Sequence, residues 1–185
     1  MIEARGRVVL VGGGARSGKS TLALRLALAV PGRRVFVATA TVGDDEMRDR
    51  IDRHRVERGA LFETVEEPLA LPELLAELRA DVVLVDCLTL WLSNLMMAEH
   101  PDVEGEVLRL VQALDQPGRT VIVVSNEVGL GIVPDNALAR RFRDVAGRAH
   151  QRLAARADEV YAGMLGLMLR LKPGPVEAVV DPGAA

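Results

Sequence analysis

A glycine-rich segment near the N-terminus carries the residue types that bind the phosphates of a nucleoside triphosphate. It fits the P-loop pattern G-x-x-x-x-G-K-[ST] with the residues Gly13, Gly14, Ala15, Arg16, Ser17, Gly18, Lys19 and Ser20. Glycines let the backbone curl so that successive N–H groups point into one anion-sized hollow. Lys19 would place its charge on the terminal phosphates, and Ser20 would offer a hydroxyl to magnesium. The alternative is an ordinary glycine-rich turn between a strand and a helix.

A carboxylate that could complete a magnesium site follows a later apolar run. Asp86 comes directly after the run at 82–85, which predicts a buried strand. Sites built on a P-loop use an acid at the tip of a neighbouring strand to hold the magnesium shell. An Asp in this place can also be only a helix cap. Because the P-loop is present, we predict Ser20 and Asp86 as metal ligands.

Among the three histidines, His54 has the setting best suited to nucleophilic chemistry. Met47, Ile51 and His54 share one stripe of a predicted polar helix. Arginines flank the histidine, and their charge should keep the imidazole neutral while they grip a triphosphate that the ring attacks. A half-buried histidine can also be purely structural, so spacing alone leaves both interpretations open. His100 and His150 are interpreted as surface or packing residues.

Short apolar runs alternate with amphipathic segments, which is typical of a parallel sheet covered by helices. We predict strands at 7–11, 35–39, 62–66, 82–85 and 120–124, and helices at 18–30, 44–58, 71–79, 88–98, 103–114 and 137–157. Residues 159–172 predict a hairpin that turns near Gly166. The prediction is a single domain over 1–172, followed by a flexible tail at 173–185 that is rich in Pro, Gly and Ala.

Composition limits the partners that the chain can have. Aromatic residues are 3% of the chain and the net charge is -3, which argues against nucleic-acid binding through base stacking or a basic surface. Cys87 is the only cysteine, so neither an intrachain disulfide nor a cysteine-based zinc site can form. No apolar stretch approaches a signal sequence or the roughly 20 residues of a membrane span. We therefore expect small-molecule partners, no membrane span and a cytoplasmic location.

Two further segments have open interpretations. The loop at 126–136 leaves a predicted strand at the sheet edge where α/β proteins bind ligands, so it suits substrate binding or subunit contact, although it could be only a connection. A second set of apolar residues at helical spacing predicts core or a subunit interface: Leu90, Trp91, Leu95 and Met96.

Four sequence blocks resemble the bifunctional adenosylcobinamide kinase / adenosylcobinamide-phosphate guanylyltransferase family. They are GGARSGKS at 13–20, ATATVGDDEM at 38–47, SNEVGLGIVPDN at 125–136 and RRFRDVAGRAHQR at 140–152. The resemblance runs from about residue 8 to 172 with the blocks in order, and N-E-V-G-x-G-I-V-P is far more specific than the P-loop. The expected fold is α/β: a RecA-like P-loop NTPase domain, its mostly parallel sheet flanked by helices and ending in an antiparallel hairpin.

The resemblance implies two reactions. In the first, ATP or GTP phosphorylates the aminopropanol hydroxyl of adenosylcobinamide. In the second, GTP gives its GMP unit to a histidine, and the GMP then passes to the new phosphate to form adenosylcobinamide-GDP. The family's histidine corresponds to His54, because D-D-E-M precedes it at the matching distance. The implied partners are adenosylcobinamide, its phosphate, ATP and GTP with Mg²⁺, and the implied assembly is a homo-oligomer, specifically a trimer.

The resemblance also implies a set of nucleotide contacts in which Lys19 and His54 are catalytic. Besides the P-loop residues, the implied contacts are Ala38, Thr39, Ala40, Arg55, Val56, Glu57, Arg58, Glu66 and Asp86. Glu67 is the alternative to Glu66. One rival interpretation is a monofunctional P-loop small-molecule kinase with no covalent histidine. A second is a nucleotide-dependent switch, which would release phosphate slowly and show no dependence on a corrinoid.

Overall fold

The computed structural model describes residues 6–41 and 61–179 of the chain. The helix predicted at 44–58 lies outside these ranges. His54 and the predicted nucleotide contacts Arg55, Val56, Glu57 and Arg58 therefore lie outside them too. For these residues the sequence predictions stay predictions.

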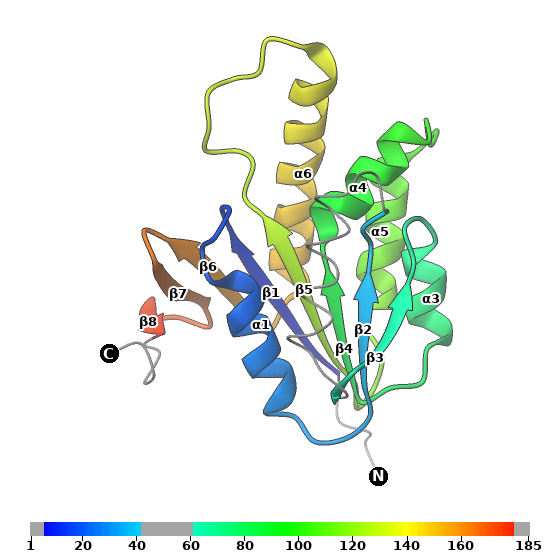
Figure 1. The fold of residues 1–185 in the computed structure, drawn as a ribbon, viewed down its shortest axis with the longest axis vertical. Helices are drawn as coiled ribbons and strands as arrows, with labels where there is room; N and C mark the ends of the chain where they lie inside the picture. The colour runs from blue at the N-terminus through cyan, green and yellow to red at the C-terminus, as the bar shows by residue number, and fades with distance from the viewer. Residues whose placement is uncertain (1–5, 42–60, 180–185) are drawn as a thin grey trace.

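One sheet organises the described residues, with its strands in the order β3-β2-β4-β5-β1-β6-β7-β8 (Figure 1). The strands are β1 (Arg7–Gly13), β2 (Arg34–Ala38), β3 (Glu63–Glu66), β4 (Val82–Asp86), β5 (Thr120–Asn126), β6 (Glu159–Met164), β7 (Leu167–Lys172) and β8 (Glu177–Val179). The pairs from β3 across to β6 are parallel, and β7 and β8 are antiparallel. The predicted mostly parallel α/β sheet with a C-terminal hairpin is confirmed.

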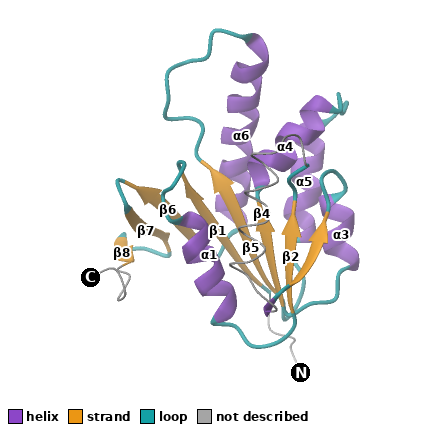
Figure 2. Ribbon diagram, in the orientation of Figure 1, coloured by secondary structure: helices purple, strands orange, loops and turns teal. Residues whose placement is uncertain are grey.

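Helices cover both faces of the sheet (Figure 2). They are α1 (Lys19–Leu28), α3 (Leu71–Glu77), α4 (Leu88–Met97), α5 (Val103–Ala113) and α6 (Ala137–Arg156). α1 packs with β1 side chains in one buried cluster, whereas the other four helices contribute to a cluster on the opposite face. No helix in the described ranges combines the length and the apolar character that crossing a membrane requires.

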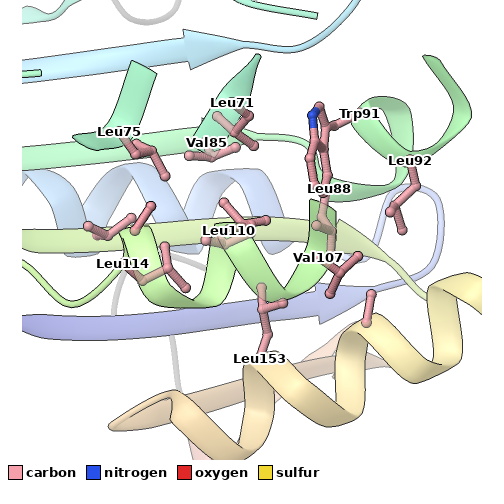
Figure 3. Packing of buried hydrophobic residues seen from close by; sticks show 14 of the residues in the cluster. Leu71, Leu75, Val85, Leu88, Trp91, Leu92, Val107, Leu110, Leu114 and Leu153 are labelled. Atoms are coloured by element: carbon pink, nitrogen blue, oxygen red, sulfur yellow. The ribbon is translucent and has the colours of Figure 1, made fainter. Parts of the chain in front are cut away.

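The middle residues of the central strands β1, β4 and β5 form continuous apolar runs because helices bury both faces of these strands. In β1, Val9 and Val11 belong to the cluster with α1, and Val8 and Leu10 belong to the cluster on the other face. The cluster on that other face contains Trp91, the largest of the fully buried side chains (Figure 3). The indole of Trp91 is fully buried and its N–H donates to the Leu69 carbonyl oxygen at 2.8 Å.

The apolar residues of α4 and α6 are only partly buried. Trp91 and Leu95 lie in the core, as predicted, whereas Leu90 and Met96 are half-buried. On α6, Leu153 is buried, whereas Leu138 in the first turn is exposed. The first turns of α6 project past the carboxyl end of the sheet, where no strand covers them (Figure 1).

The C-terminal segment corrects one expectation. A flexible tail was predicted from residue 173, but β8 pairs antiparallel with β7, matching Ala178 to Leu169. An ion pair between Arg170 and Glu177 joins the same two strands. β7 would otherwise present unpaired backbone groups at the sheet edge, and β8 satisfies part of them. A three-residue strand is too short to be recognised from alternation. Residues 180–185 lie outside the described ranges.

Candidate functional site

The P-loop joins the end of β1 to the start of α1, as the sequence predicts. β1 ends at Gly13 and α1 begins at Lys19, with Gly18 at the N-cap in a left-handed conformation of φ 85°. Gly13 has φ +155°, and a Cβ there would lie 2.5 Å from Ser17 Oγ. Any other residue at this position would have to displace the Ser17 side chain and adopt a strained backbone conformation. The N-terminus of α1 faces this loop and favours an anion.

Two side chains of the loop are arranged for a polyanion. Lys19 is 7% exposed and its ammonium group donates to the Gly14 carbonyl oxygen at 3.0 Å, so the side chain crosses the loop. Ser17 Oγ is buried and has no hydrogen-bond partner among the described residues. An unpaired buried hydroxyl is costly, and a phosphate oxygen would satisfy it. The loop thus fits a nucleotide phosphate chain.

The predicted acidic residues end neighbouring strands at the same sheet edge. Ala38 at the end of β2 is in register with both Glu66 of β3 and Asp86 of β4. On the other side, Gly13 is in register with Asn126 of β5. These positions all lie at the carboxyl ends of parallel strands, where α/β folds bind their ligands.

Lys19 and Asp86 act in opposite directions on the pKa of the buried Cys87 thiol. Burial raises the pKa of the Cys87 thiol, the Asp86 carboxylate raises it further, and the Lys19 ammonium acts in the opposite direction. The thiol therefore stays protonated at neutral pH and is no nucleophile. The charges of Lys19 and Asp86 thus both reach the Cys87 thiol.

Thr39 holds the strand ends in place. The side chain is fully buried, and its hydroxyl donates to the Cys87 carbonyl oxygen and accepts from the Cys87 N–H, both at 2.8 Å. The Asn94 amide donates to the Thr39 carbonyl oxygen at 2.7 Å and ties α4 to the same point. The Thr39 hydroxyl is thus engaged in hydrogen bonds to the backbone of Cys87, the residue after Asp86. A direct nucleotide contact by Thr39 or by the half-buried Ala40 stays a prediction.

The structure gives different roles to the two adjacent glutamates. Glu67 accepts hydrogen bonds from the N–H groups of Leu69 (2.9 Å) and Ala70 (2.7 Å), ahead of α3. Glu66 is exposed at the end of β3. The Glu67 carboxylate is therefore occupied by this turn, and a nucleotide contact by Glu66 stays a prediction.

Ser125, His150 and Glu127 form a row of polar side chains at the end of β5. No chemical role was predicted for them from the sequence. Ser125 Oγ lies 2.7 Å from His150 Nε2, and His150 Nδ1 lies 3.7 Å from Glu127 Oε2. Burial lowers the pKa of His150, opposed by the Glu127 carboxylate, so the imidazole is neutral at pH 7. His150 was predicted to be a surface or packing residue. The available signal was that polar residues directly follow a strand predicted to be buried, at the ligand-binding edge of the sheet.

The loop after β5 leads into α6 and carries exposed apolar side chains. Leu130, Ile132 and Val133 are 79%, 97% and 63% exposed. The Asn136 side chain caps α6 by accepting from the Ala139 N–H at 2.7 Å. The loop lies beside the first turns of α6, beyond the sheet edge (Figure 1).

Within residues 6–41 and 61–179, no group of three or more His, Cys, Asp or Glu side chains is arranged to hold a metal ion. A magnesium ion of the P-loop type does not need such a group, because it takes most of its ligands from water and phosphate oxygens. Ser20 and Asp86 would supply one hydroxyl and one carboxylate. This donor set fits magnesium and is unlike that of a structural zinc site.

We predict that Gly13→Ala weakens triphosphate binding by at least about tenfold, because the new methyl group would collide with Ser17 and distort the cradle. Binding of a fluorescent nucleotide analogue measures the effect. Gly147→Ala is the control, since a Cβ on Gly147 of α6 meets no atom within 4 Å. It should leave nucleotide affinity unchanged and raise the free energy of unfolding by about 0.5–1 kcal/mol. Wild-type affinity in Gly13→Ala would contradict the requirement for glycine.

Comparison with known proteins gives a family match over nearly the whole chain. Residues 9–171 match the family described as cobinamide kinase / cobinamide phosphate guanyltransferase. The chain is 49% identical over 175 residues to the bifunctional adenosylcobalamin biosynthesis protein CobP of Pseudomonas aeruginosa, covering 90% of this chain and 98% of that one. It is 40% identical over 181 residues to the bifunctional adenosylcobalamin biosynthesis protein CobU of Salmonella typhimurium, covering 89% and 99%.

Solved structures share the fold at low sequence identity. The RadB recombinase superposes with a TM-score of 0.53 at 19% identity, covering 90% of this chain and 80% of that one. An ATPase from the type III secretion system of pathogenic bacteria superposes with a TM-score of 0.55 at 11% identity, covering 84% of this chain and 50% of that one. These similarities support the RecA-like architecture alone.

Proposed function

The chain belongs to the cobinamide kinase / cobinamide phosphate guanyltransferase family, and from this premise we propose how its own residues carry out both reactions. The protein is a bifunctional kinase and guanylyltransferase of adenosylcobalamin biosynthesis. The observation that supports our assignment is the P-loop between β1 and α1, at the sheet edge where β4 ends in Asp86. A monofunctional kinase or a nucleotide switch is set aside, because the family combines both activities.

For the kinase step, we propose that ATP or GTP lies with its phosphates in the loop 13–20. Lys19 would neutralise charge on the terminal phosphates, and Ser17 Oγ, buried without a partner among the described residues, would donate to a phosphate oxygen. The hydroxyl of adenosylcobinamide would attack the γ-phosphorus in line with the departing diphosphate. Fixed donors of this kind stabilise the transition state because they need no reorganisation as charge develops.

For the guanylyl transfer, we propose His54 as the nucleophile. Its imidazole nitrogen would attack the α-phosphorus of GTP and expel pyrophosphate, and an oxygen of adenosylcobinamide phosphate would then displace the histidine. The other proposed nucleotide contacts are Arg55, Val56, Glu57 and Arg58, which lie outside the described residues, and Ala38, Thr39, Ala40 and Glu66. The alignment of Glu66, Ala38 and Asp86 on one edge supports a nucleotide site there.

We propose that Ser20 and Asp86 hold Mg²⁺ beside the phosphates. When bound, the ion would neutralise phosphate charge. We further propose that the enzyme works in the cytoplasm, where ATP and GTP are available. We also propose a homo-oligomer, specifically a trimer, and the exposed apolar residues Leu130, Ile132 and Val133 support a subunit contact or substrate-binding role for their loop. Light scattering should then give a mass three times that of the chain.

The proposed function is tested by supplying the substrates in turn. With Mg²⁺ and ATP or GTP, adenosylcobinamide should be converted to its phosphate, as followed by chromatography of the coloured corrinoid. With GTP, the phosphate should be converted to adenosylcobinamide-GDP with release of pyrophosphate. Triphosphate hydrolysis at the same rate with and without the corrinoid, and no modified corrinoid, would contradict the proposal.

A further inference from the structure

Glu127 occupies a position at the phosphate-binding edge that the proposed function leaves without a role. It directly follows β5, and its backbone N–H donates to the Gly13 carbonyl oxygen at 3.1 Å. β5 lies between β1, which carries the P-loop, and β4, which ends at Asp86. The main chain of Glu127 is therefore hydrogen-bonded to the first residue of the P-loop. It follows the strand that lies between β1, which leads to Lys19, and β4, which ends at Asp86.

The Glu127 side chain is the outermost member of a chain of polar groups. Ser125 is fully buried, the His150 side chain is 20% exposed and that of Glu127 is 37% exposed. His150 is neutral, so one ring nitrogen carries its single proton. If Ser125 donates to Nε2, then Nδ1–H faces the Glu127 carboxylate, 3.7 Å away. The imidazole thus lies beside the carboxylate, on the side toward Ser125, and the carboxylate stays partly exposed.

We propose that Glu127 is the general base of the kinase step and that His150 is a positioning residue for its carboxylate. The inference rests on the proposed kinase reaction and adds a residue to it. The carboxylate takes the proton of the substrate hydroxyl while the hydroxyl oxygen bonds to the γ-phosphorus. The bond from that phosphorus to the β–γ bridging oxygen breaks, and the nucleoside diphosphate leaves with the electron pair. The proton then passes from Glu127 to solvent.

The second reaction of the same protein does not need this base. The acceptor in guanylyl transfer is a phosphate group, which is largely a dianion at neutral pH and attacks without a base to remove a proton. A base specific to hydroxyl activation should therefore affect phosphorylation and spare guanylyl transfer. This difference allows each activity to serve as the internal control for the other.

A structural role for Glu127 makes the opposite prediction. Its Oε1 accepts from the Gly129 N–H at 2.5 Å, so the side chain also orders the start of the loop. If ordering the loop or the P-loop were its only role, removing the negative charge would impair both reactions alike or neither. The amide of Glu127→Gln can still accept from Gly129, so this variant removes the base while keeping that hydrogen bond.

The test compares Glu127→Gln with Glu77→Gln, an exposed control on α3. For Glu127→Gln we expect kcat for adenosylcobinamide phosphorylation to fall about 10²–10³-fold with KM nearly unchanged. Guanylyl transfer from GTP to supplied adenosylcobinamide phosphate should stay within about threefold of wild type. Glu127→Asp should recover part of the kinase kcat, and Glu77→Gln should leave both activities unchanged.

The positioning role of His150 has its own variants. His150→Leu removes the ring and should lower the kinase kcat about tenfold with little effect on KM or on guanylyl transfer. His150→Asn, whose side-chain amide lies near the place of Nδ1, should restore part of this loss because it can still donate toward Glu127. Equal kinase activity in the two variants would overturn the positioning role.

The outcomes separate the inference from the proposed function. Kinase activity of Glu127→Gln within about threefold of wild type, or equal loss of both activities, would overturn the assignment of the base while leaving the two reactions established. Failure of the wild-type protein to phosphorylate the corrinoid would overturn the proposed function, and the inference with it.

Discussion

His54→Ala is expected to abolish guanylyl transfer while leaving corrinoid phosphorylation within a few-fold of wild type. If His54 carries GMP as a phosphoramidate, no other group can take over the covalent step, and the transferase rate should fall about 10⁴-fold or more. Incubation with Mg²⁺ and GTP labelled at the α-phosphate should leave label on the denatured wild-type chain. That label should be labile in acid, stable in base and absent from His54→Ala.

His100→Ala is the matched control for this experiment. His100 follows α4, where its Nδ1 accepts from the Asp102 N–H at 3.3 Å, and no role at the site is proposed for it. It should incorporate label as the wild type does. Absence of label on the wild-type chain, under conditions where GTP demonstrably binds, would refute the guanylyl-histidine and leave a P-loop kinase whose second activity needs another route.

Lys19→Ala is expected to lower both activities, each by about 10²–10³-fold. The lysine is the one charge that the P-loop sequence directs at the terminal phosphates, and its substitution removes a donor that stabilises developing negative charge. The variant also loses the hydrogen bond to the Gly14 carbonyl oxygen. Steady-state assays of phosphorylation and of guanylyl transfer, with affinity for the triphosphate measured separately, check the prediction.

The control is the other lysine of the chain. Lys172 also donates to backbone carbonyl oxygens, those of Ala154 and Ala155 at the end of α6, and it lies in β7 away from the P-loop. Lys172→Ala should keep both activities. If Lys19→Ala lost phosphorylation alone, the two reactions would not share the P-loop, and the guanylyl transfer would need a second triphosphate site.

Local patterns in the sequence determined the P-loop and most of the elements around it. The cradle is built from contiguous residues, and its shape depends on the backbone freedom of Gly13 and Gly18, so the motif and its geometry come together. The continuous apolar runs of β1, β4 and β5 predict strands buried on both faces, and this is how they lie. Magnesium binding at Ser20 and Asp86 stays a prediction.

Contacts between distant residues were decided by the tertiary structure. Periodicity tells which face of an element is buried but not which element lies next to it. For that reason the position of β5 between β1 and β4 could not be predicted. The hydrogen bond from the Thr39 hydroxyl to the Cys87 carbonyl oxygen could not be predicted either. The hydrogen bonds that the Glu67 carboxylate accepts in the turn before α3 were likewise visible only in the tertiary structure.

The sequence by itself determined that this protein has a P-loop for a nucleoside triphosphate. It also determined the resemblance to one family of bifunctional kinases and guanylyltransferases. Only the tertiary structure brought Ser125 and His150 to within 2.7 Å and set Glu127 beside Gly13. Motifs are local because a phosphate is cradled by consecutive N–H groups. A base and the group that positions it meet through the packing of α6 against the sheet, and no local pattern records that packing.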